Sequence, residues 1–427
     1  MPRRLLPFIA ILSLAGITAA PLAGQVSTPL GQIPVPRVGG ALGDLAHPAT
    51  ETLGQTSSLA QRQARSLLRA RDQRLDRLLR ANRDRIERDA AGNLARRSEL
   101  LVTDVDGQSL PVLEKAGFRV IASETIEGLD IALVRLQVPL AMSLAKAETL
   151  ASRLAPDADI SADTLHFQTG VEGWSAASVG LSLLQNASGS AIATPVGMID
   201  SAPGAATKVL ATKGFASGAL APSDHGSAIA SLLQGEGVQR IWAADIYGTD
   251  PAGGNALSVG RALGWLVTSG CKVITISLVG PRNAVVERAV ANAQARGVIV
   301  VAAVGNDGPA APPAYPASYD GVLAITGVDR KGRALIEAGR ALHLDYAAPG
   351  ADVYARNAGG KLVRWRGTSF ATPLAASRVA AALQQGSGQE GTGWRAKLDS
   401  EARDLGPKGP DKTYGRGLLC EGCAAKN

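Results

Sequence analysis

The sequence predicts an α/β fold with a doubly wound, mainly parallel sheet, preceded by a small α+β region. Residues 193–200 and 298–306 are two short apolar stretches, and such stretches are typical of strands that are buried on both faces. The first ends in Asp200 and the second in Asn306. Because open α/β sheets place their chemistry at the carboxyl ends of the strands, these two polar residues indicate a candidate site.

The N-terminus has the pattern of a secretory signal peptide. A charged start, residues 1–4, precedes an apolar stretch at 5–20. Its length barely spans a bilayer, and Pro7, Gly16 and the adjoining Pro21 favour removal. We therefore expect a signal peptide at 1–24 that is cleaved between Ala19 and Gly24, and an uncleaved membrane anchor is the alternative. The chain is therefore expected to be secreted or periplasmic. Residues 25–57, rich in Pro, Gly, Thr and Ser, predict a flexible linker.

Residues 58–98 predict a basic amphipathic helix. Between Arg62 and Arg97 there are twelve arginines and five acidic residues, a balance that equals the net charge of +7 of the whole chain. Leu68, Leu75 and Leu78 recur at helical spacing. We expect this helix to dock on the following domain, and contact with a membrane surface or an acidic partner is the alternative. Nucleic acid is not an expected partner of a secreted chain.

Residues 99–170 predict a small α+β domain. Two helices are expected, at 110–116 and 140–154. Four strands are expected around them, at 100–102, 118–123, 129–138 and 158–162. The resulting order, βαββαβ, is that of the ferredoxin-like arrangement.

Two further motifs supply a histidine and a serine. His225 lies at the start of a helix of small residues that runs to Gly235. Ser369 precedes an alanine-rich helix expected at 374–383, and we expect Pro373 in the first helical turn, where its missing N–H costs nothing. The helix N-terminus would aim its N–H groups and positive dipole at the serine oxygen, where an oxyanion develops during acyl transfer.

The four motifs, in the order Asp200, His225, Asn306 and Ser369, resemble those of the subtilisin-like serine proteases, the subtilase family. The resemblance covers roughly residues 193–419. It implies that Ser369 is the nucleophile, His225 the general base and Asp200 the residue that orients the histidine. Asn306 would donate a hydrogen bond to the oxyanion together with the Ser369 N–H. The implied activity is that of a serine endopeptidase that cleaves protein or peptide substrates through an acyl-enzyme.

Further stretches extend the resemblance across a catalytic domain at 171–419, followed by a C-terminal tail at 420–427. The apolar stretch 273–281 resembles the family's substrate-binding strand. The substrate-binding residues implied there are Ser277, Leu278, Val279 and Gly280. Val279 stands where the family often has glycine, so we expect a narrowed pocket that favours small side chains.

The α+β domain at 99–170 resembles the inhibitory propeptide of subtilases. The implied role of this N-terminal partner is to assist folding of the protease and then to occlude it. Its exit, from His166 to Glu172, would be the maturation site. Three alternatives stay open. The domain could be a retained one that tethers the protease or recruits substrate. The protein could also be a catalytically silent binding or scaffold protein, or a narrow processing peptidase that cuts one partner near the membrane.

Three cysteines occur in the chain. Cys271 precedes an apolar strand and is expected in the core. For Cys420 and Cys423 we expect a terminal disulfide in an oxidising compartment, and free thiols, intermolecular pairing and a metal or redox pair are the alternatives. No cofactor is required by the implied mechanism. Structural calcium is possible but not evident, because no loop clusters acidic ligands.

Overall fold

The computed structural model describes residues 25–28, 31–34, 49–168, 171–172, 191–385 and 393–423. The predicted signal peptide, residues 1–24, lies outside the described residues. The chain divides into two units, residues 1–45 and 46–427. In the first unit, strands β1 (Gln25–Thr28) and β2 (Gly31–Pro34) form an antiparallel hairpin within the predicted linker.

Helix α1 spans Ala49–Ala81, so it begins and ends earlier than the predicted range 58–98. The side-chain amide of Asn82 donates to the Leu78 carbonyl at 3.0 Å, at the end of the helix. The rest of the predicted helix is instead strand β3 (Ile86–Arg88) and the start of strand β4 (Leu94–Thr103). The prediction of a helix beyond residue 81 was therefore wrong. It followed the arginine-rich composition, whereas Ile86 and Leu94 are buried and belong to strands.

The small α+β domain has the predicted βαββαβ order from β4 onward. Its remaining elements are α2 (Ser109–Lys115), β5 (Arg119–Ile126), β6 (Ile131–Gln137), α3 (Leu144–Leu154) and β7 (Asp159–Thr164). The sheet is antiparallel, with the order β3-β4-β6-β5 and with β7 paired to β4. Leu113, Leu136 and Leu144 form part of its core.

The larger sheet has seven strands in the order β11-β12-β10-β13-β15-β16-β17, and all its pairings are parallel. The strands are β10 (Val196–Asp200), β11 (Ala211–Gly214), β12 (Ile241–Asp245), β13 (Val273–Ile276), β15 (Ile299–Ala303), β16 (Leu323–Val328) and β17 (Tyr346–Pro349). From β10 the chain first forms the edge strand β11, then returns to form β12 between β11 and β10, and then crosses to β13 on the other side of β10. Between β10 and β13 the strand order therefore reverses, which is where such folds place their sites.

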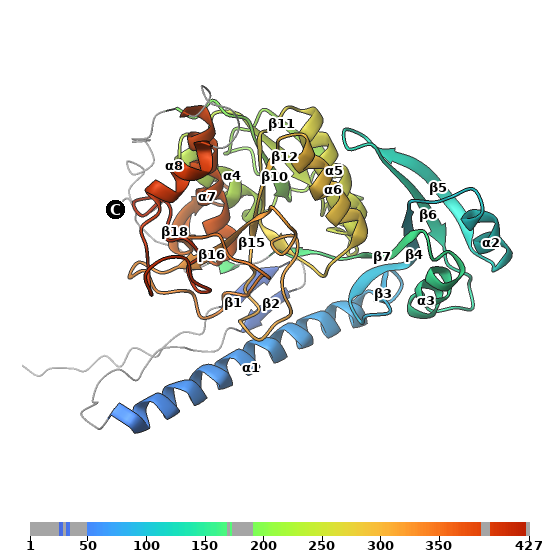
Figure 1. Ribbon diagram of the computed structural model, residues 1–427, viewed down its shortest axis with the longest axis horizontal. Coiled ribbons are helices and arrows are strands. Elements are labelled where there is room, and N and C mark those ends of the chain that lie inside the picture. Colours follow the sequence, from blue (N-terminus) through green and yellow to red (C-terminus); the bar gives the residue numbers. More distant parts are fainter. Residues whose placement is uncertain are drawn as a thin grey trace, which may run out of the picture. The chain divides into compact units, whose positions relative to one another are not determined.

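Helices cover both faces of this sheet (Figure 1). One face carries α4 (Asp224–Gly235) and α7 (Thr368–Gln385), and the other carries α5 (Ala256–Thr268) and α6 (Ala284–Ala295). Along β10, Met198 packs in the cluster of α4 and α7, and Ile199 packs in that of α5 and α6. Both faces of the strand are thus buried, which explains its continuous apolar sequence. Strands β18 (Ala351–Arg356) and β19 (Leu362–Arg366) precede α7 in the chain, and helix α8 (Gly393–Glu401) follows it.

Strand β7 of the small domain meets the N-termini of α5 and α6. The Asp163 carboxylate accepts a hydrogen bond from the Leu257 N–H at 3.0 Å, in the first turn of α5. Asn283, the N-cap of α6, donates through its side-chain amide to the Ala162 carbonyl at 2.9 Å. The first N–H groups of a helix lack helical partners, and Asp163 satisfies one of them in α5. At α6 the Ala162 carbonyl instead holds Asn283, whose side-chain oxygen accepts the Val285 N–H. These contacts fix the path of the chain as it leaves β7 towards the larger sheet.

Candidate active site

Asp200 and His225 are in direct contact at the carboxyl edge of the sheet. Asp200 ends β10, and His225 is the second residue of α4, whose N-cap Ser223 accepts a hydrogen bond from the Gly226 N–H. The histidine Nδ1 lies 2.9 and 3.0 Å from the two carboxylate oxygens. A carboxylate at that distance favours the tautomer with hydrogen on Nδ1, which puts Nε2 in its proton-accepting form.

The Asp200 carboxylate is fully buried and is held by several donors. Besides His225, the Ser201 N–H donates to Oδ1 at 2.8 Å and the Gln168 side-chain amide donates at 2.7 Å. A buried carboxylate needs such donors, because desolvation otherwise disfavours its charged form. Gln168 was not singled out from the sequence, since a lone glutamine carries no motif.

Ser369 is the second residue of α7, which begins at Thr368 rather than at the predicted residue 374. Pro373 therefore lies in the second turn and not in the first. It has no N–H to donate to the Ser369 carbonyl one turn earlier. The Ser277 hydroxyl donates to that carbonyl at 2.9 Å, and the Ser369 Oγ donates to the Ser277 carbonyl at 3.0 Å.

Asn306 lies just after β15 and contacts the start of α7. Its side-chain oxygen accepts the Thr368 N–H at 3.0 Å. Its side-chain nitrogen is buried and has no hydrogen-bond partner among the described residues. Because the oxygen end is fixed by Thr368, the amide presents an unused donor. Such a donor fits an oxyanion that forms beside Ser369.

Contacts between neighbours link the four residues predicted to be catalytic. Asp200 contacts His225, whose ring centroid lies 5.3 Å from that of Phe370, the residue after Ser369. Asn306 contacts Thr368, the residue before Ser369. The ends of β10 and β15 and the starts of α4 and α7 therefore converge on one place.

A segment of the chain itself runs along this site, and we call residues 165–168 and 171–172 the cleft segment. Strand β8 (Phe167–Gln168) pairs antiparallel with β14 (Leu278–Val279), which follows Ser277. Strand β9 (Val171–Glu172) pairs antiparallel with β19, which leads to Ser369. The backbone is thus held on both sides of the serine. Within the predicted maturation site, residues 169–170 lie outside the described residues.

His166 anchors the cleft segment at its start. Its N–H donates to the Gly254 carbonyl at 2.8 Å, and its own carbonyl accepts from the Tyr247 hydroxyl at 3.2 Å. The imidazole is fully buried, and neither ring nitrogen has a partner among the described residues. It lies against Gly280, where an added Cβ would meet the ring at 2.4 Å. Burial lowers the pKa of His166 to about 4, so the ring is neutral at ordinary pH.

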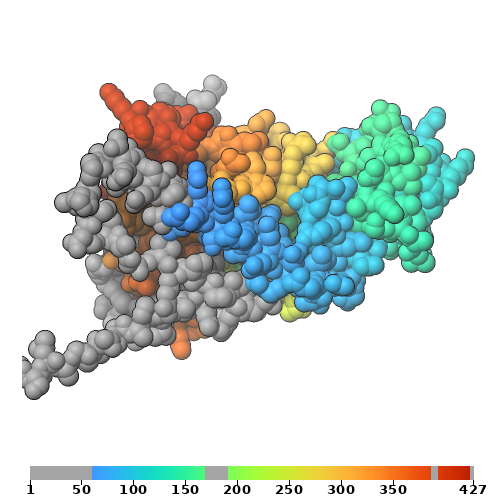
Figure 2. Space-filling model, turned by 90° about the horizontal axis from the view of Figure 1, so that it is seen from below, coloured from blue at the N-terminus to red at the C-terminus, as the bar shows by residue number. Residues whose placement is uncertain are grey.

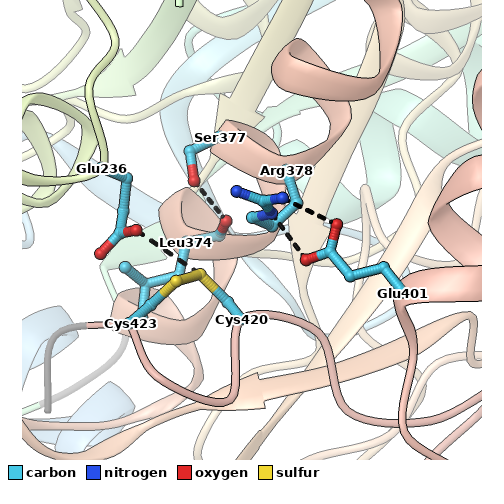
Figure 3. Close-up of a disulfide and its surroundings, with 7 residues drawn as sticks. All are labelled: Glu236, Leu374, Ser377, Arg378, Glu401, Cys420 and Cys423. Atoms are coloured by element: carbon cyan, nitrogen blue, oxygen red, sulfur yellow. Dashed lines mark hydrogen bonds and ion pairs between the residues drawn. A yellow bond between two sulfur atoms is a disulfide. The ribbon is translucent and has the colours of Figure 1, made fainter. Parts of the chain in front are cut away.

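The predicted terminal disulfide is present between Cys420 and Cys423 (Figure 3). Glu236 Oε2 lies 3.8 Å from the Cys420 sulfur. In the described part of the chain, Glu236, Cys420 and Cys423 form a cluster of side chains of the kinds that bind metal ions. Because the disulfide ties up both sulfurs, no thiolate is left to bind a metal. Cys271 is free and buried as predicted, and burial raises its pKa to about 12.

Within the described residues, no helix is long and apolar enough to cross a bilayer.

The Subtilase family profile matches residues 212–417 of the chain, a range that begins after Asp200. Subtilisin BL of Lederbergia lenta is 33% identical over 180 residues, which cover 42% of this chain and 65% of the relative. Subtilisin DY of Bacillus licheniformis is 35% identical over 167 residues, 38% of this chain and 60% of the relative. The chain therefore spans less than two thirds of the length of these relatives.

Two further matches concern location and fold. The minor extracellular protease Epr of Bacillus subtilis (strain 168) is 28% identical over 205 residues, 46% of this chain and 32% of that protein. Fervidolysin from Fervidobacterium pennivorans, a keratinolytic enzyme related to subtilisin, superposes with a TM-score of 0.63 at 18% identity, covering 78% of this chain and 61% of its own. That superposition extends the shared fold beyond the residues of the family match.

Proposed function

We propose that this chain, which belongs to the subtilase family of serine proteases, is a secreted endopeptidase that is made as a zymogen. The observation that carries this proposal is the Asp200–His225 pair beside a serine at the start of a helix, with a peptide segment already paired on both sides of that serine. Secretion is supported by the signal-like N-terminus and by the extracellular relative.

In the proposed mechanism, Nε2 of His225 takes the proton of the Ser369 hydroxyl as Oγ attacks the scissile carbonyl. Asp200 keeps the imidazole in the required tautomer and stabilises the imidazolium. The Asn306 side-chain amide and the Ser369 N–H receive the oxyanion. The histidine then protonates the leaving amine, and water resolves the acyl-enzyme with His225 again acting as base. The mechanism needs no metal or organic cofactor, since side chains and a backbone amide perform every step.

The substrate backbone is proposed to take the place of β8 and pair with Leu278 and Val279, because β14 already holds an extended strand there. In the full chain the cleft segment excludes other peptides. The small α+β domain acts as the inhibitor that keeps the segment in place, since β7 meets α5 and α6 directly before it. Cleavage within residues 166–172 would separate the inhibitor from the protease.

The test is intact mass and N-terminal sequencing of the purified wild type beside Ser369→Ala, with labelling by a fluorophosphonate probe. We expect the wild type to lose its N-terminal part through a cut within 166–172 and to be labelled. Ser369→Ala should keep that part and take no label. Absence of labelling in a folded wild type from which the N-terminal part has been removed would contradict the proposed activity.

A further inference from the structure

Helix α1 contacts the catalytic domain and the cleft segment through one of its sides. Arg74 donates through Nη2 to both carboxylate oxygens of Asp307, at 3.0 and 3.2 Å. On the same side, Leu75 and Leu78 pack in an apolar cluster with the half-buried Phe167 of the cleft segment. This inner side therefore holds the helix against the protease and against the peptide that occupies its site.

A row of arginines lies on the opposite side of α1. Its members, which we call the outer arginine row, are Arg62, Arg65, Arg69, Arg77 and Arg80. Successive residues of a helix are turned by about 100°, so positions three, four, seven or eight apart share one face. On that count the mean direction of the row points roughly 170° away from that of Arg74, Leu75 and Leu78. All five side chains are exposed, and Figure 2, which views the molecule from below, shows the helix in blue at the surface.

No acidic side chain of the described residues pairs with the outer arginine row. The acidic residues of α1 in this stretch are Asp72, which pairs with Arg71 at 3.3 Å, and Asp76, which pairs with Arg88 at 2.6 Å. Residues 62–97 carry a charge equal to the +7 of the whole chain, so the remainder is neutral in sum. Like charges three or four residues apart destabilise a helix, so this unpaired row favours the binding of an anionic surface.

The composition of the outer face indicates lipid phosphate as the anion. Within the described residues, no large apolar side chain of α1 is exposed. Protein interfaces have an apolar core, and insertion of an amphipathic helix into a membrane needs an apolar face, so this face fits neither. It fits electrostatic attraction to a flat surface of anionic headgroups. From Arg62 to Arg80 the helix rises about 27 Å, so the row can meet several headgroups at once.

We propose that the outer arginine row binds the headgroups of anionic phospholipids and holds the full chain at a membrane surface. Each guanidinium carries a fixed positive charge and can donate two hydrogen bonds to one phosphate. The binding itself depends on α1 alone. Its consequence rests on the proposed function as well, because a cut within 166–172 would leave the row on the membrane with the N-terminal part and would release the protease. Activation then takes place at the membrane, and the mature enzyme leaves it.

The main test measures binding of the purified Ser369→Ala chain, which keeps its N-terminal part, to vesicles that are sedimented. One set of vesicles contains equal parts of phosphatidylglycerol and phosphatidylcholine, and the other contains phosphatidylcholine alone. We expect binding to the anionic set only, at about 0.1 M salt. Most of it should be lost at about 0.5 M salt, because screening shortens the range of the attraction.

The variant that removes the row carries Arg62→Gln, Arg65→Gln, Arg69→Gln, Arg77→Gln and Arg80→Gln. Its partition coefficient on the anionic vesicles should fall by about 30- to 1,000-fold, as expected when two to four of the five basic groups act near the surface. Replacement of the same five arginines by lysine should keep binding within about fivefold, since the attraction requires the charge and not the shape of the guanidinium.

A matched control removes five positive charges from the catalytic domain instead, through Lys272→Gln, Lys331→Gln, Lys361→Gln, Lys408→Gln and Lys412→Gln. These lysines are exposed, and among the described residues they form no ion pair. The net charge of this control equals that of the arginine variant, yet its binding should fall by less than about fivefold, because attraction is lost beyond the Debye length. Thermal unfolding of each chain checks that it is folded.

The outcomes separate the inference from the proposed function. An equal loss of binding in the arginine and lysine variants, or equal binding to neutral vesicles, would overturn the inference. Binding to polyglutamate by a chain that leaves anionic vesicles unbound would also overturn it and would indicate an acidic protein as the partner. The matured wild type should no longer sediment with the vesicles, and continued sedimentation would contradict the proposed release. A wild type that never takes the fluorophosphonate label would contradict the proposed function, whereas vesicle binding by the Ser369→Ala chain would still support the inference.

Discussion

Ser277 and Ser369 exchange two hydrogen bonds, each hydroxyl donating to the backbone carbonyl of the other, at 2.9 and 3.0 Å. Both residues are buried. The exchange ties the end of β13 to the start of α7. It also supplies the Ser369 carbonyl with the donor that Pro373 cannot give. The backbone of the proposed nucleophile is thus held by a side chain from the sheet, and the hydroxyl of Ser277 becomes a structural part of the site.

We predict that Ser277→Ala lowers the free energy of unfolding by about 1–3 kcal/mol, because it leaves a buried carbonyl without a donor. The measurement is urea unfolding in the Ser369→Ala background, which avoids self-digestion. Pro373→Ala would restore an N–H one turn after Ser369. The cost of Ser277→Ala should therefore shrink in the Pro373→Ala chain. An equal cost in both backgrounds would contradict this account.

Asn306 is expected to act on turnover more than on binding. Asn306→Ala should lower kcat by about 10²- to 10³-fold with little change in KM, a magnitude known from the corresponding amide of subtilisin itself and not obtained from this structure. Asn306→Asp keeps an acceptor for the Thr368 N–H but loses the donor, so it should be equally impaired. Steady-state kinetics on one peptide decide this, with thermal unfolding as the check on folding. Full activity in Asn306→Asp would exclude the donor role.

Local sequence patterns predicted individual helices and strands, but not the contacts between residues that lie far apart in the chain. The apolar stretch before Asp200 and the small-residue helix after His225 have the patterns of their elements, so the sheet strand and the helix could be predicted from the sequence. The Asp200–His225 contact was predicted only through the resemblance of the motifs to those of the subtilases. The arginines at 85–97 were assigned to a helix because charge was counted and strand burial could not be seen.

Contacts between distant segments were beyond the reach of sequence patterns. Pro373 was predicted in the first helical turn because its missing N–H costs nothing there. The donor that makes the second turn possible, the Ser277 hydroxyl, lies 92 positions before Ser369 and could not be inferred from the local sequence. The pairing of Arg74 with Asp307 joins residues 233 positions apart, and nothing in the local sequence of either residue indicates the other as its partner. Likewise, nothing in the local sequence of Gln168 indicates that its amide reaches Asp200.

Gln168 is predicted to hold the cleft segment through its hydrogen bond to Asp200. Gln168→Glu would place a second carboxylate against a buried one, and like charges at that distance repel strongly. We expect faster loss of the N-terminal part, or weaker inhibition by it, in Gln168→Glu. Gln168→Met keeps the length without the charge and should have a smaller effect. The time course of maturation by gel and intact mass provides the measurement, and slower release in Gln168→Glu would be evidence against the contact.

Thiol titration should distinguish the three cysteines. In the native, unreduced protein we expect no reaction with Ellman's reagent, because Cys271 is buried with a pKa raised to about 12 and the other two form a disulfide. Denaturation without reductant should expose one thiol, and reduction should expose three. Three thiols after denaturation alone would mean that Cys420 and Cys423 are not bonded in solution.

The buried His166 is predicted to make the full chain less stable in mild acid. Its pKa is about 4 in the folded chain and about 6.5 when the ring is exposed. At pH values between about 4 and 6.5 the unfolded state binds a proton at His166 that the folded state excludes. His166 therefore does not lower the free energy of unfolding above about pH 6.5, and it lowers that free energy progressively as the pH decreases towards 4. Asp163 acts in the opposite direction, because burial raises its pKa to about 7. A comparison with a variant that keeps Asp163 therefore isolates the histidine.

His166→Phe is that variant, since it replaces the imidazole with an aromatic ring that does not titrate. In the Ser369→Ala background, the unfolding temperature should fall between pH 7.5 and pH 5.0 by several degrees more in the chain that keeps His166 than in the His166→Phe chain. The larger ring could strain its contact with Gly280, so the difference between the two pH values is compared and not the absolute temperature. Parallel pH profiles in the two chains would show that the ring is protonated, or accessible to water, while the cleft segment is bound.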